Sequence, residues 1–521
     1  MRGSAPACGA KTTVLAVLLL AGCSNDAPPP PAEDGSSSGG PSFATDDGAD
    51  VIPTACVPGQ ARPCYEGPFG TVDVGRCRSG QQICSADGSV WSACEGEIRP
   101  ADEESCQTPE DDDCDGSVQC SPTLEWILPI SGLVQQMTAT PDGGAVVCGF
   151  GNGLGPGTFG AFVLAVDAQG QVKWERTIDE EGFQEVFGLK ADADGQITLA
   201  GRYEGAPDYG GGPLPSAVAL DSFAVRYDAE GNYLWGQTLG TSAYTSTTTG
   251  PDGTAYVSGG VINLTIDGEQ VSGNFFVAAI SPSGELGWVT TGGGAFPTTE
   301  YWYEMDMVGD DEIALLVMLE PFGVPEFGGV PLELELPFAQ PVLFRLGTDG
   351  AVRGYDTLSE LPAYISGGRI HVHSRSDGEV TTASGVFVAG DSGTRPHILV
   401  TRSDGVAPPV QTQLIGENVV IRAVDRDPPG GIVLGIDFSG QLRLGDMGIS
   451  APLFSSGQAV TVVDDQGQAR WVELLGTEDY ADLRAVAASS DGAVFVAADI
   501  EGLASFAGHT VVEPFIAKLR P

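Results

Sequence analysis

One pattern recurs along residues 123–521 and constrains the fold more than any other feature of the chain. An apolar strand leads into a turn with Asp-Gly, a second apolar strand ends at glycine, and a Gly-rich loop precedes a third strand, a DxxG turn and a strand with tryptophan. The clearest copies lie at residues 189–235 and 486–519. Because turns of this kind join alternating apolar strands into hairpins, each copy predicts a sheet of four antiparallel strands.

The two turns differ in number, and the difference predicts how the array ends. The first turn occurs seven times, at Asp142, Asp194, Asp252, Asp310, Asp377, Asp427 and Asp491. The second occurs only six times, because the last copy stops after its third strand, while an extra strand around Trp126 precedes the first copy. The 399 residues in seven copies give a period of about 57, which is typical of propeller blades. The sequence therefore predicts an all-β chain with a seven-bladed β-propeller at 123–521, closed by pairing of its N- and C-terminal strands.

Tryptophan recurs once in most copies at the same strand position, as Trp126, Trp174, Trp235, Trp288 and Trp471. We expect these indoles to pack between adjacent sheets rather than to form a ligand-stacking ring in the pore. The Gly-rich loops between the second and third strands vary most in length, which is typical of binding loops. The strings DYGGGPL, RYDAEGNYLW and EFGGVPL resemble SBBP-type propeller repeats of bacterial surface proteins.

The N-terminus carries an export signal. Residues 1–22 combine a short basic start with an apolar run too short to span a membrane, which is typical of a signal peptide. The string Leu20-Ala21-Gly22-Cys23 resembles a bacterial lipobox, which implies that Cys23 becomes the acylated first residue of a lipoprotein. The alternative is a plain secretory signal with an incidental cysteine. By resemblance to enterobacterial sorting, Ser24 implies delivery to the outer membrane.

Residues 23–55 contain PPPP and DGSSSGG and predict a disordered tether.

Residues 56–122 are dense in cysteine. Eight lie at Cys56, Cys64, Cys77, Cys84, Cys94, Cys106, Cys114 and Cys120. An even number in a short exported segment predicts four disulfides, whose connectivity the sequence leaves open. A zinc site is disfavoured, because the segment has neither a CxxC pair nor histidine. The segment resembles the Cys-rich module of myxobacterial lipoproteins, which ends in a DDDCDG string that such families associate with metal.

The DDDCDG string offers a candidate metal site. Asp111, Asp113, Asp115 and Gly116 match positions 1, 3, 5 and 6 of a calcium-binding loop, where alternate carboxylates converge on one cation. The twelfth position is Pro122 rather than glutamate, so other ligands such as Glu110 would be needed. The alternative is an acidic linker between Cys114 and Cys120. Ca²⁺ is the only cofactor that the sequence suggests.

Composition and isolated motifs bound the function. With 70 acidic against 24 basic residues the net charge is −46, which argues against nucleic acid as a partner. His371 and His373 share a face of one expected strand, and residues 390–393 form the string GDSG, but neither has the partners that metal or serine chemistry requires. A quinoprotein is disfavoured by the lack of a vicinal cysteine pair.

Two functions from different classes follow. The first is a monomeric, non-catalytic envelope lipoprotein whose propeller binds protein or polysaccharide. The alternative is an enzyme of the propeller pore, a metal-assisted hydrolase or lyase, or a quinoprotein. Such an enzyme would need carboxylates or histidines at equivalent inner-strand positions, and the sequence shows no such set.

Overall fold

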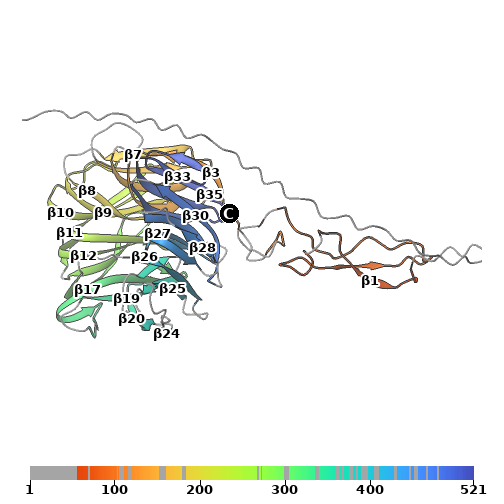
Figure 1. The fold of residues 1–521 in the computed structure, drawn as a ribbon. Coiled ribbons are helices and arrows are strands. Elements are labelled where there is room, and N and C mark those ends of the chain that lie inside the picture. The colour runs from red at the N-terminus through yellow and green to blue at the C-terminus, as the bar shows by residue number, and fades with distance from the viewer. Residues whose placement is uncertain are drawn as a thin grey trace, which may run out of the picture.

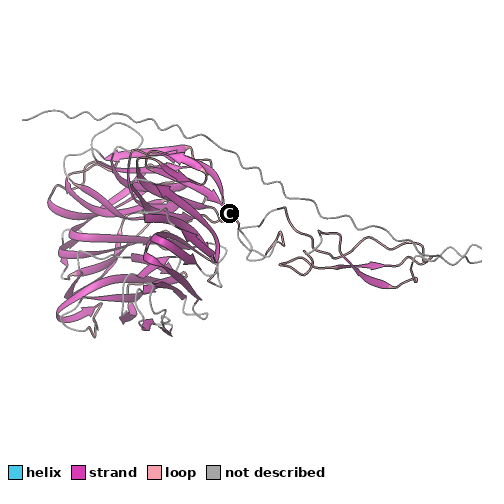
Figure 2. Cartoon of the chain, viewed as in Figure 1, coloured by secondary structure: helices cyan, strands magenta, loops and turns pink. Residues whose placement is uncertain are grey.

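The computed structural model describes residues 56–521 apart from short gaps. These gaps are 69–70, 103, 105–110, 115–119, 152–159, 179–182, 267–268, 272, 298–303, 335–338, 358–362, 367–368, 375–378, 383–384, 389–396, 404–409, 427–430, 445–446, 451–455, 465–466 and 478–479. The strands beyond residue 123 gather into one body, and the Cys-rich segment extends away from it (Figure 1). Every regular element in the described ranges is a strand, as Figure 2 shows. The same ranges contain no helix long and apolar enough to cross a membrane.

The strands pair in successive antiparallel sets of four, which we number first to seventh. The first set is β4 (Gly132–Ala139), β5 (Ala145–Gly151), β6 (Gly160–Val166) and β7 (Val172–Ile178). The second is β8 (Gln184–Ala191), β9 (Ile197–Gly205), β10 (Ala217–Tyr227) and the first half of β11 (Tyr233–Thr249). The third is the second half of β11 with β12 (Ala255–Ile266), β14 (Phe275–Ile280) and β15 (Leu286–Pro297).

The later sets follow the same order. The fourth set is β16 (Glu304–Val308), β17 (Glu312–Phe327), β19 (Gln340–Gly347) and β20 (Val352–Thr357). The fifth is β21 (Ala363–Ser366), β22 (Arg369–Ser374), β25 (His397–Ser403) and the start of β26 (Val410–Arg426). The sixth is the rest of β26 with β27 (Ile432–Leu444), β29 (Ser456–Val463) and β30 (Ala469–Thr477). The seventh joins β31 (Tyr480–Ala488), β32 (Val494–Glu501) and β35 (Phe515–Arg520) to β3 (Thr123–Pro129).

Short additional strands extend some sets. They are β13 (Glu269–Val271), β18 (Val330–Pro331), β28 (Met447–Ser450), β33 (Ala504–Phe506) and β34 (His509–Val511). Two others, β23 (Glu379–Thr382) and β24 (Gly385–Val388), pair with each other in a separate two-stranded sheet. In the Cys-rich segment, β1 (Ala61–Cys64) pairs with β2 (Gly80–Ile83).

The sets are arranged around their first strands. The first strand of each set contacts the first strand of the next, from β4 through β8, β11, β16, β21, β26 and β31 back to β4. The apolar cores lie between the sets: one joins Cys148 of β5 to Phe223 of β10, and another joins Val460 of β29 to Val496 of β32. An arrangement of antiparallel sheets stacked around a common centre is a β-propeller.

Four tryptophans fasten their sets to the next ones. The Nε1 atoms of Trp126, Trp174, Trp235 and Trp288 donate to a backbone carbonyl in the next DxxG turn, over 2.9 to 3.1 Å. The glycine of that turn has a positive φ and lies under the indole. A Cβ at Gly231, for example, would come within 2.5 Å of Trp174 Cδ2. The tryptophans therefore pack between adjacent sheets, as the sequence predicted, and they also explain why the turn requires glycine.

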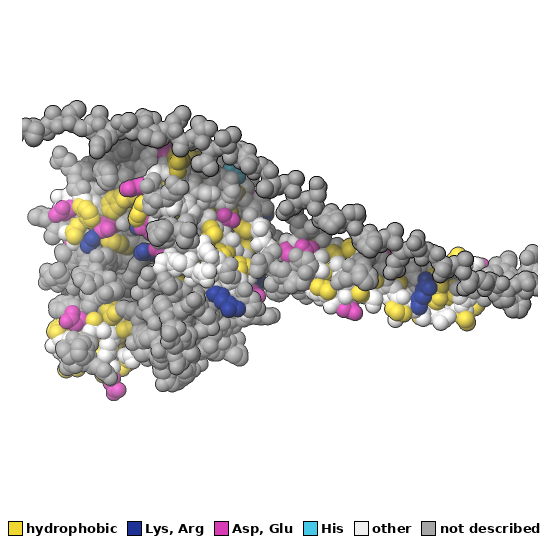
Figure 3. Space-filling model, viewed as in Figure 1, with side chains coloured by type: hydrophobic (Ala, Val, Ile, Leu, Met, Phe, Trp, Pro, Cys, Tyr) yellow, Lys and Arg dark blue, Asp and Glu magenta, His cyan; other side chains and the backbone are white. Residues whose placement is uncertain are grey.

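The acidic side chains of the turns have a structural role. Asp167, Asp192 and Asp228 each accept two hydrogen bonds from backbone N–H groups of their own turn through Oδ1. Aspartate favours such turns for this reason. On the face drawn in Figure 3, acidic side chains lie scattered rather than gathered in one patch. These aspartates therefore stabilise their turns.

Candidate functional site

The DDDCDG string forms part of an acidic cluster in the Cys-rich segment. Ligand-type oxygens of Glu104, Asp111 and Asp113 all lie within 4.8 Å of one another. Asp111 is only 6% exposed. The structure thus brings together two of the three aspartates predicted from the sequence, while Asp115 lies outside the described residues. Glu104, which the sequence analysis did not predict, is the third carboxylate of the cluster. The sequence analysis suggested Glu110 as a further ligand, and Glu110 lies outside the described residues.

Backbone contacts and a disulfide position this cluster. Gly75, with φ near +52°, lies against Asp111, because a Cβ at Gly75 would come within 2.2 Å of the Asp111 carbonyl oxygen. The next residue, Arg76, donates its N–H to that carbonyl over 3.0 Å and pairs its guanidinium with Asp112. Cys114 is bonded to Cys77. The central aspartate of the string is therefore bound by arginine, and its two neighbours face Glu104.

The electrostatics of the cluster suit a hard cation. Burial raises the pKa of Glu104, and the charges of Asp113 and Asp111 raise it further, against a hydrogen bond of 2.9 Å that Glu104 Oε1 accepts from Asp113 N. The repulsion between carboxylates held this close falls when one of them binds a proton or when a cation binds between them. Three carboxylates and no sulfur or nitrogen ligand form a donor set for Ca²⁺ rather than Zn²⁺.

The disulfides of the segment are resolved in three pairs. Cys56 bonds Cys84, Cys64 bonds Cys94, and Cys77 bonds Cys114. Cys120 is disulfide-bonded as well, and Cys106 lies outside the described residues. The backbone N–H of Cys120 also points to the carbonyl of Arg470 at 3.5 Å, so the end of the module contacts the outer strand of the sixth set.

The inner strands carry a polar layer that the sequence analysis missed. Lys190, Thr248 and Asp425 each stand one residue before the strand residue that closes the first turn, and Asp306 stands two residues before it. Lys190 Nζ reaches from β8 to Asp306 Oδ1 of β16 at 3.1 Å, and Thr248 Oγ1 donates to the same oxygen over 3.0 Å. Two carboxylates, Asp306 and Asp425, thus lie on inner strands, beside the lysine and threonine of other sets.

This layer holds neighbouring sets together. Burial lowers the pKa of Lys190, but the carboxylates of Asp306, Asp425 and Glu304 outweigh it and raise that pKa overall. Lys190 therefore stays charged at neutral pH and bridges the second set to the fourth across β11. The Asp425 Oδ2 atom accepts a hydrogen bond of 2.8 Å from the N–H of Ala488 in the seventh set.

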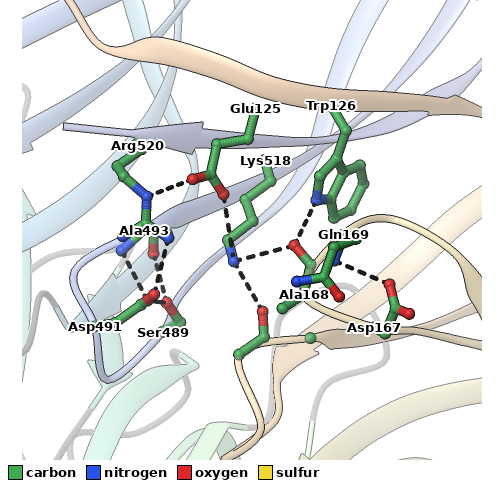
Figure 4. Close-up of polar contacts among 12 residues, drawn as sticks. Glu125, Trp126, Asp167, Ala168, Gln169, Ser489, Asp491, Ala493, Lys518 and Arg520 are labelled. Carbon is green, nitrogen blue, oxygen red and sulfur yellow. Dashed lines mark hydrogen bonds and ion pairs between the residues drawn. The ribbon is translucent and has the colours of Figure 1, made fainter.

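A second polar contact lies where the first strand of the propeller, β3, meets its last strand, β35 (Figure 4). Lys518 of β35 is 1% exposed and donates to the carbonyl of Gly143, in the first turn of the first set, over 3.0 Å. Its Nζ also lies 3.5 Å from Glu125 of β3, which pairs with Arg520. Arg226 makes the equivalent contact in the second set, donating to Gly253 of the next first turn over 2.6 Å.

The described Gly-rich loops are fastened to the propeller body by their aromatic residues. Tyr209 is 1% exposed, and Phe327 and Phe506 are fully buried. The Phe327 ring packs on Phe275 of the preceding set at 4.9 Å between centroids. The repeated DYGGGPL-like strings therefore mark an anchor residue, which limits how far these loops can serve as free binding loops.

The remaining sequence candidates carry no described site. His371 and His373 lie on β22, and the structure does not describe their side chains. The GDSG string at 390–393 and Cys23 lie outside the described residues. Cys148 is a fully buried free cysteine, and burial raises the pKa of its thiol far above neutral pH. It packs as a small buried apolar residue.

Comparison with known proteins adds little. No family model and no curated protein matches the chain. Among solved structures, the Dos1 propeller is 11% identical with a TM-score of 0.36, covering 78% of this chain and 96% of that one. The β-propeller domain of the Trilobed protease from Pyrococcus furiosus is 10% identical with a TM-score of 0.31, covering 62% and 96%. A mutant apocarotenoid oxygenase from Synechocystis is 10% identical with a TM-score of 0.32, covering 66% and 74%. At these scores the three structures do not bear on what the chain does.

Proposed function

We propose that the chain is a non-catalytic lipoprotein of the cell envelope whose β-propeller is a binding scaffold for protein or polysaccharide. The observation that carries this proposal is the use of the polar groups at the inner strands. Lys190 and Thr248 both bind Asp306, and they hold the second, third and fourth sets together, as a scaffold requires. A hydrolase or lyase would instead direct such groups at a substrate.

The scaffold is a ring of seven blades closed by β3. Three observations support this proposal: β3 pairs with β35 from Thr123 opposite Arg520 to Pro129 opposite Phe515, Trp126 fastens the seventh set to the first, and β31 contacts β4. Closure of this kind leaves no open sheet edge between the first and last blades.

The anchor precedes the scaffold in the chain. Acylation of Cys23 and the tether of residues 23–55 would hold the disulfide-bonded module and a monomeric propeller at the outer membrane. Metabolic labelling with a fatty-acid analogue, followed by fractionation of the membranes, tests this arrangement. We expect label and outer-membrane location in the wild type and neither in Cys23→Ser. Label that persists in the variant would contradict the anchor.

The module holds Ca²⁺ through Glu104, Asp111 and Asp113, with Asp115 as a further ligand. Calorimetric titration of the unlipidated chain after chelation tests this proposal. We expect one Ca²⁺ per chain, lost in Asp111→Asn/Asp113→Asn and retained in the matched control Asp102→Asn, whose carboxylate is exposed in the same module. Binding that survives the double substitution would contradict the site.

The scaffold itself is tested by adsorption of the fluorescent, unlipidated chain to vesicles made from the cell envelope. Loss of binding after protease treatment of the vesicles indicates a protein ligand, and loss after periodate treatment indicates a polysaccharide. A chain that adsorbs to neither untreated vesicles nor whole cells would contradict the scaffold.

A further inference from the structure

A pocket opens between the first and second sets, on the face of the propeller that carries the Asp-Gly and DxxG turns. Its volume is about 130 Å³, and the first turns of both sets, the indole of Trp174 and Ala165 of β6 border it. This volume is below that of pockets for drug-sized ligands. The pocket therefore suits a single side chain or a molecule of similar size.

In two other sets, a buried cation fills the corresponding place. Arg226 in the second set, Lys518 in the seventh and Ala165 in the first all lie opposite the second residue of the second strand of their set. Lys518 donates to the carbonyl of Gly143, and Arg226 donates to that of Gly253, each in the first turn of the next set (Figure 4 shows the contact of Lys518). Ala165 has no group that could reach the next turn in this way.

Two further replacements widen the pocket. Arg226 also binds the side chains of Asp192 and Gln196, in the first turn of its own set. The N–H of Asp192 donates to the carbonyl of Gln196, and in the first set the same backbone bond joins Thr140 to Gly144. Each large residue of the second set thus has a small counterpart in the first. The pocket is the space that these smaller residues leave.

The backbone acceptor of the filled places is repeated at the pocket. Gly195, which lines it, is the first-turn glycine of the second set. Its φ of +76° matches the +80° of Gly143 and Gly253, and all three N–H groups donate to the carbonyl three residues earlier over 3.0 Å. Because the turns have the same conformation, the Gly195 carbonyl faces the preceding set as the Gly143 carbonyl faces Lys518.

A carboxylate at the rim supplies the opposite charge that a buried cation requires. Each of the two buried cations pairs with a carboxylate of its own set. At the pocket, Asp194 is exposed on the rim, and no described cation pairs with it. Asp142, across the pocket, is already paired with Lys173 over 2.8 Å. The net charge of −46 also favours a basic partner.

We propose that this pocket binds a lysine or arginine side chain of a partner protein. The charged end of that side chain takes the place of the buried cations of the other sets and binds the Gly195 carbonyl and the Asp194 carboxylate. Its methylene groups pack on Ala165, and the Trp174 indole adds a cation–π contact. This inference rests on the proposed function, and it narrows the ligand of the scaffold to a protein with a basic surface.

Saturation-transfer difference NMR of the unlipidated chain tests the pocket. The probes are N-acetyl-lysine methylamide and N-acetyl-arginine methylamide, beside the uncharged N-acetyl-norleucine methylamide. Ala165→Lys fills the pocket with a cation of the chain itself, as Lys518 does in the seventh set, and Asp194→Asn removes the carboxylate of the rim. Asp252→Asn is the matched control, because it removes the same charge from the first turn of the third set, where Arg226 already fills the place. Circular dichroism verifies the fold of each variant.

We expect both basic probes to bind the wild type and Asp252→Asn, with binding about tenfold weaker in Asp194→Asn and lost in Ala165→Lys. If Ala165→Lys does not fold, Asp194→Asn beside Asp252→Asn decides. Equal binding of the norleucine probe, no binding of the basic probes, or binding that the site variants leave unchanged would contradict the pocket.

Adsorption to envelope vesicles separates this inference from the proposed function. We expect protease-sensitive adsorption of the wild type, weakened in Asp194→Asn and not in Asp252→Asn. Adsorption at the wild-type level in Asp194→Asn and Ala165→Lys would contradict the pocket and leave the scaffold in place. A wild type that does not adsorb would contradict the scaffold, and with it the partner protein proposed for the pocket.

Discussion

Removal of the Trp126 side chain tests whether the N-terminal strand completes the last blade. The indole lies 5.9 Å from the Phe495 ring between centroids, covers Gly170, and donates to Ala168 over 3.0 Å. Truncation of a buried tryptophan to alanine costs about 3–5 kcal/mol, of which the hydrogen bond accounts for about 1 kcal/mol. Since Trp126 is only half-buried, we expect Trp126→Ala to lower the free energy of unfolding by about 2–3 kcal/mol.

Urea unfolding of the unlipidated chain, followed by far-ultraviolet circular dichroism, measures this loss. Trp174→Ala is the matched control, because Trp174 makes the same contact between the first and second sets, within the continuous chain. We expect similar losses in the two variants if β3 is an integral fourth strand. A Trp126→Ala variant within about 0.5 kcal/mol of the wild type, beside a destabilised Trp174→Ala, would refute this reasoning, since a change of that size is typical of the surface.

Three further outcomes are expected. Gly231→Ala places a Cβ against the Trp174 ring at a φ of +79°, so we expect a loss of about 2 kcal/mol or more in urea unfolding, against little change for Gly354→Ala, where the Cβ meets open space. Arg226→Met leaves the Asp192 carboxylate buried without its guanidinium partner, and we expect a loss of about 3–5 kcal/mol, with a much smaller loss indicating that the ion pair is dispensable. Burial alone would raise the pKa of Asp491, but hydrogen bonds from Ser489 and Arg520 hold it at about 2, below its ordinary value of 3.8. Because the folded-state pKa of Asp491 is depressed, its ionised carboxylate stabilises the fold above about pH 4, and this stabilisation is lost as the pH falls toward 2. The side chain is 45% exposed, so the stabilisation amounts to about 1 kcal/mol. Acid unfolding of Asp491→Asn beside the wild type measures it.

The parts of the fold that were predictable from the sequence are those set by local chemistry. The turns that the structure describes lie where Asp-Gly and DxxG predicted them, because glycine at Gly170 or Gly231 adopts a positive φ and aspartate accepts the backbone N–H groups of its own turn. The tryptophan spacing indicated packing between sheets, which the Nε1 contacts of Trp174 and Trp288 confirm. These signals repeat in most copies, so one copy supports the interpretation of another.

Contacts between distant segments were not predictable in the same way. Lys190 meets Asp306 only because β8 and β16 flank β11 at the centre of the propeller, and the fourth copy lacks the tryptophan that marks most other copies. Register also shows that Gly354 occupies the tryptophan position of that copy, beside Tyr355. Side-chain partners that depend on register between sets cannot be found from spacing within one set.

The acidic site shows the same division. The alternation of Asp111 and Asp113 predicted that they converge on one cation, and ligand-type oxygens of the two residues lie within 4.8 Å of each other. Glu104 lies outside the acidic string, and it comes close through the folding of the chain between Cys77 and Cys114. In the sequence, Glu104 follows Glu103 in an acidic segment, and nothing in that pattern distinguishes it from a solvent-exposed glutamate.

A circular permutant tests ring closure most directly. The permutant begins at Gly132, runs to Arg520, and continues with residues 123–131 at its new C-terminus. A DxxG turn copied from 228–232 joins Arg520 to Thr123, which are cross-strand partners in β35 and β3. The parent for comparison is residues 123–521, with residues 132–521 as the control that lacks β3. We predict that the permutant unfolds at or above the melting temperature of the parent, and that the control is clearly less stable. A control as stable as the parent, with a permutant that fails to fold, would contradict closure of the propeller by its N-terminal strand.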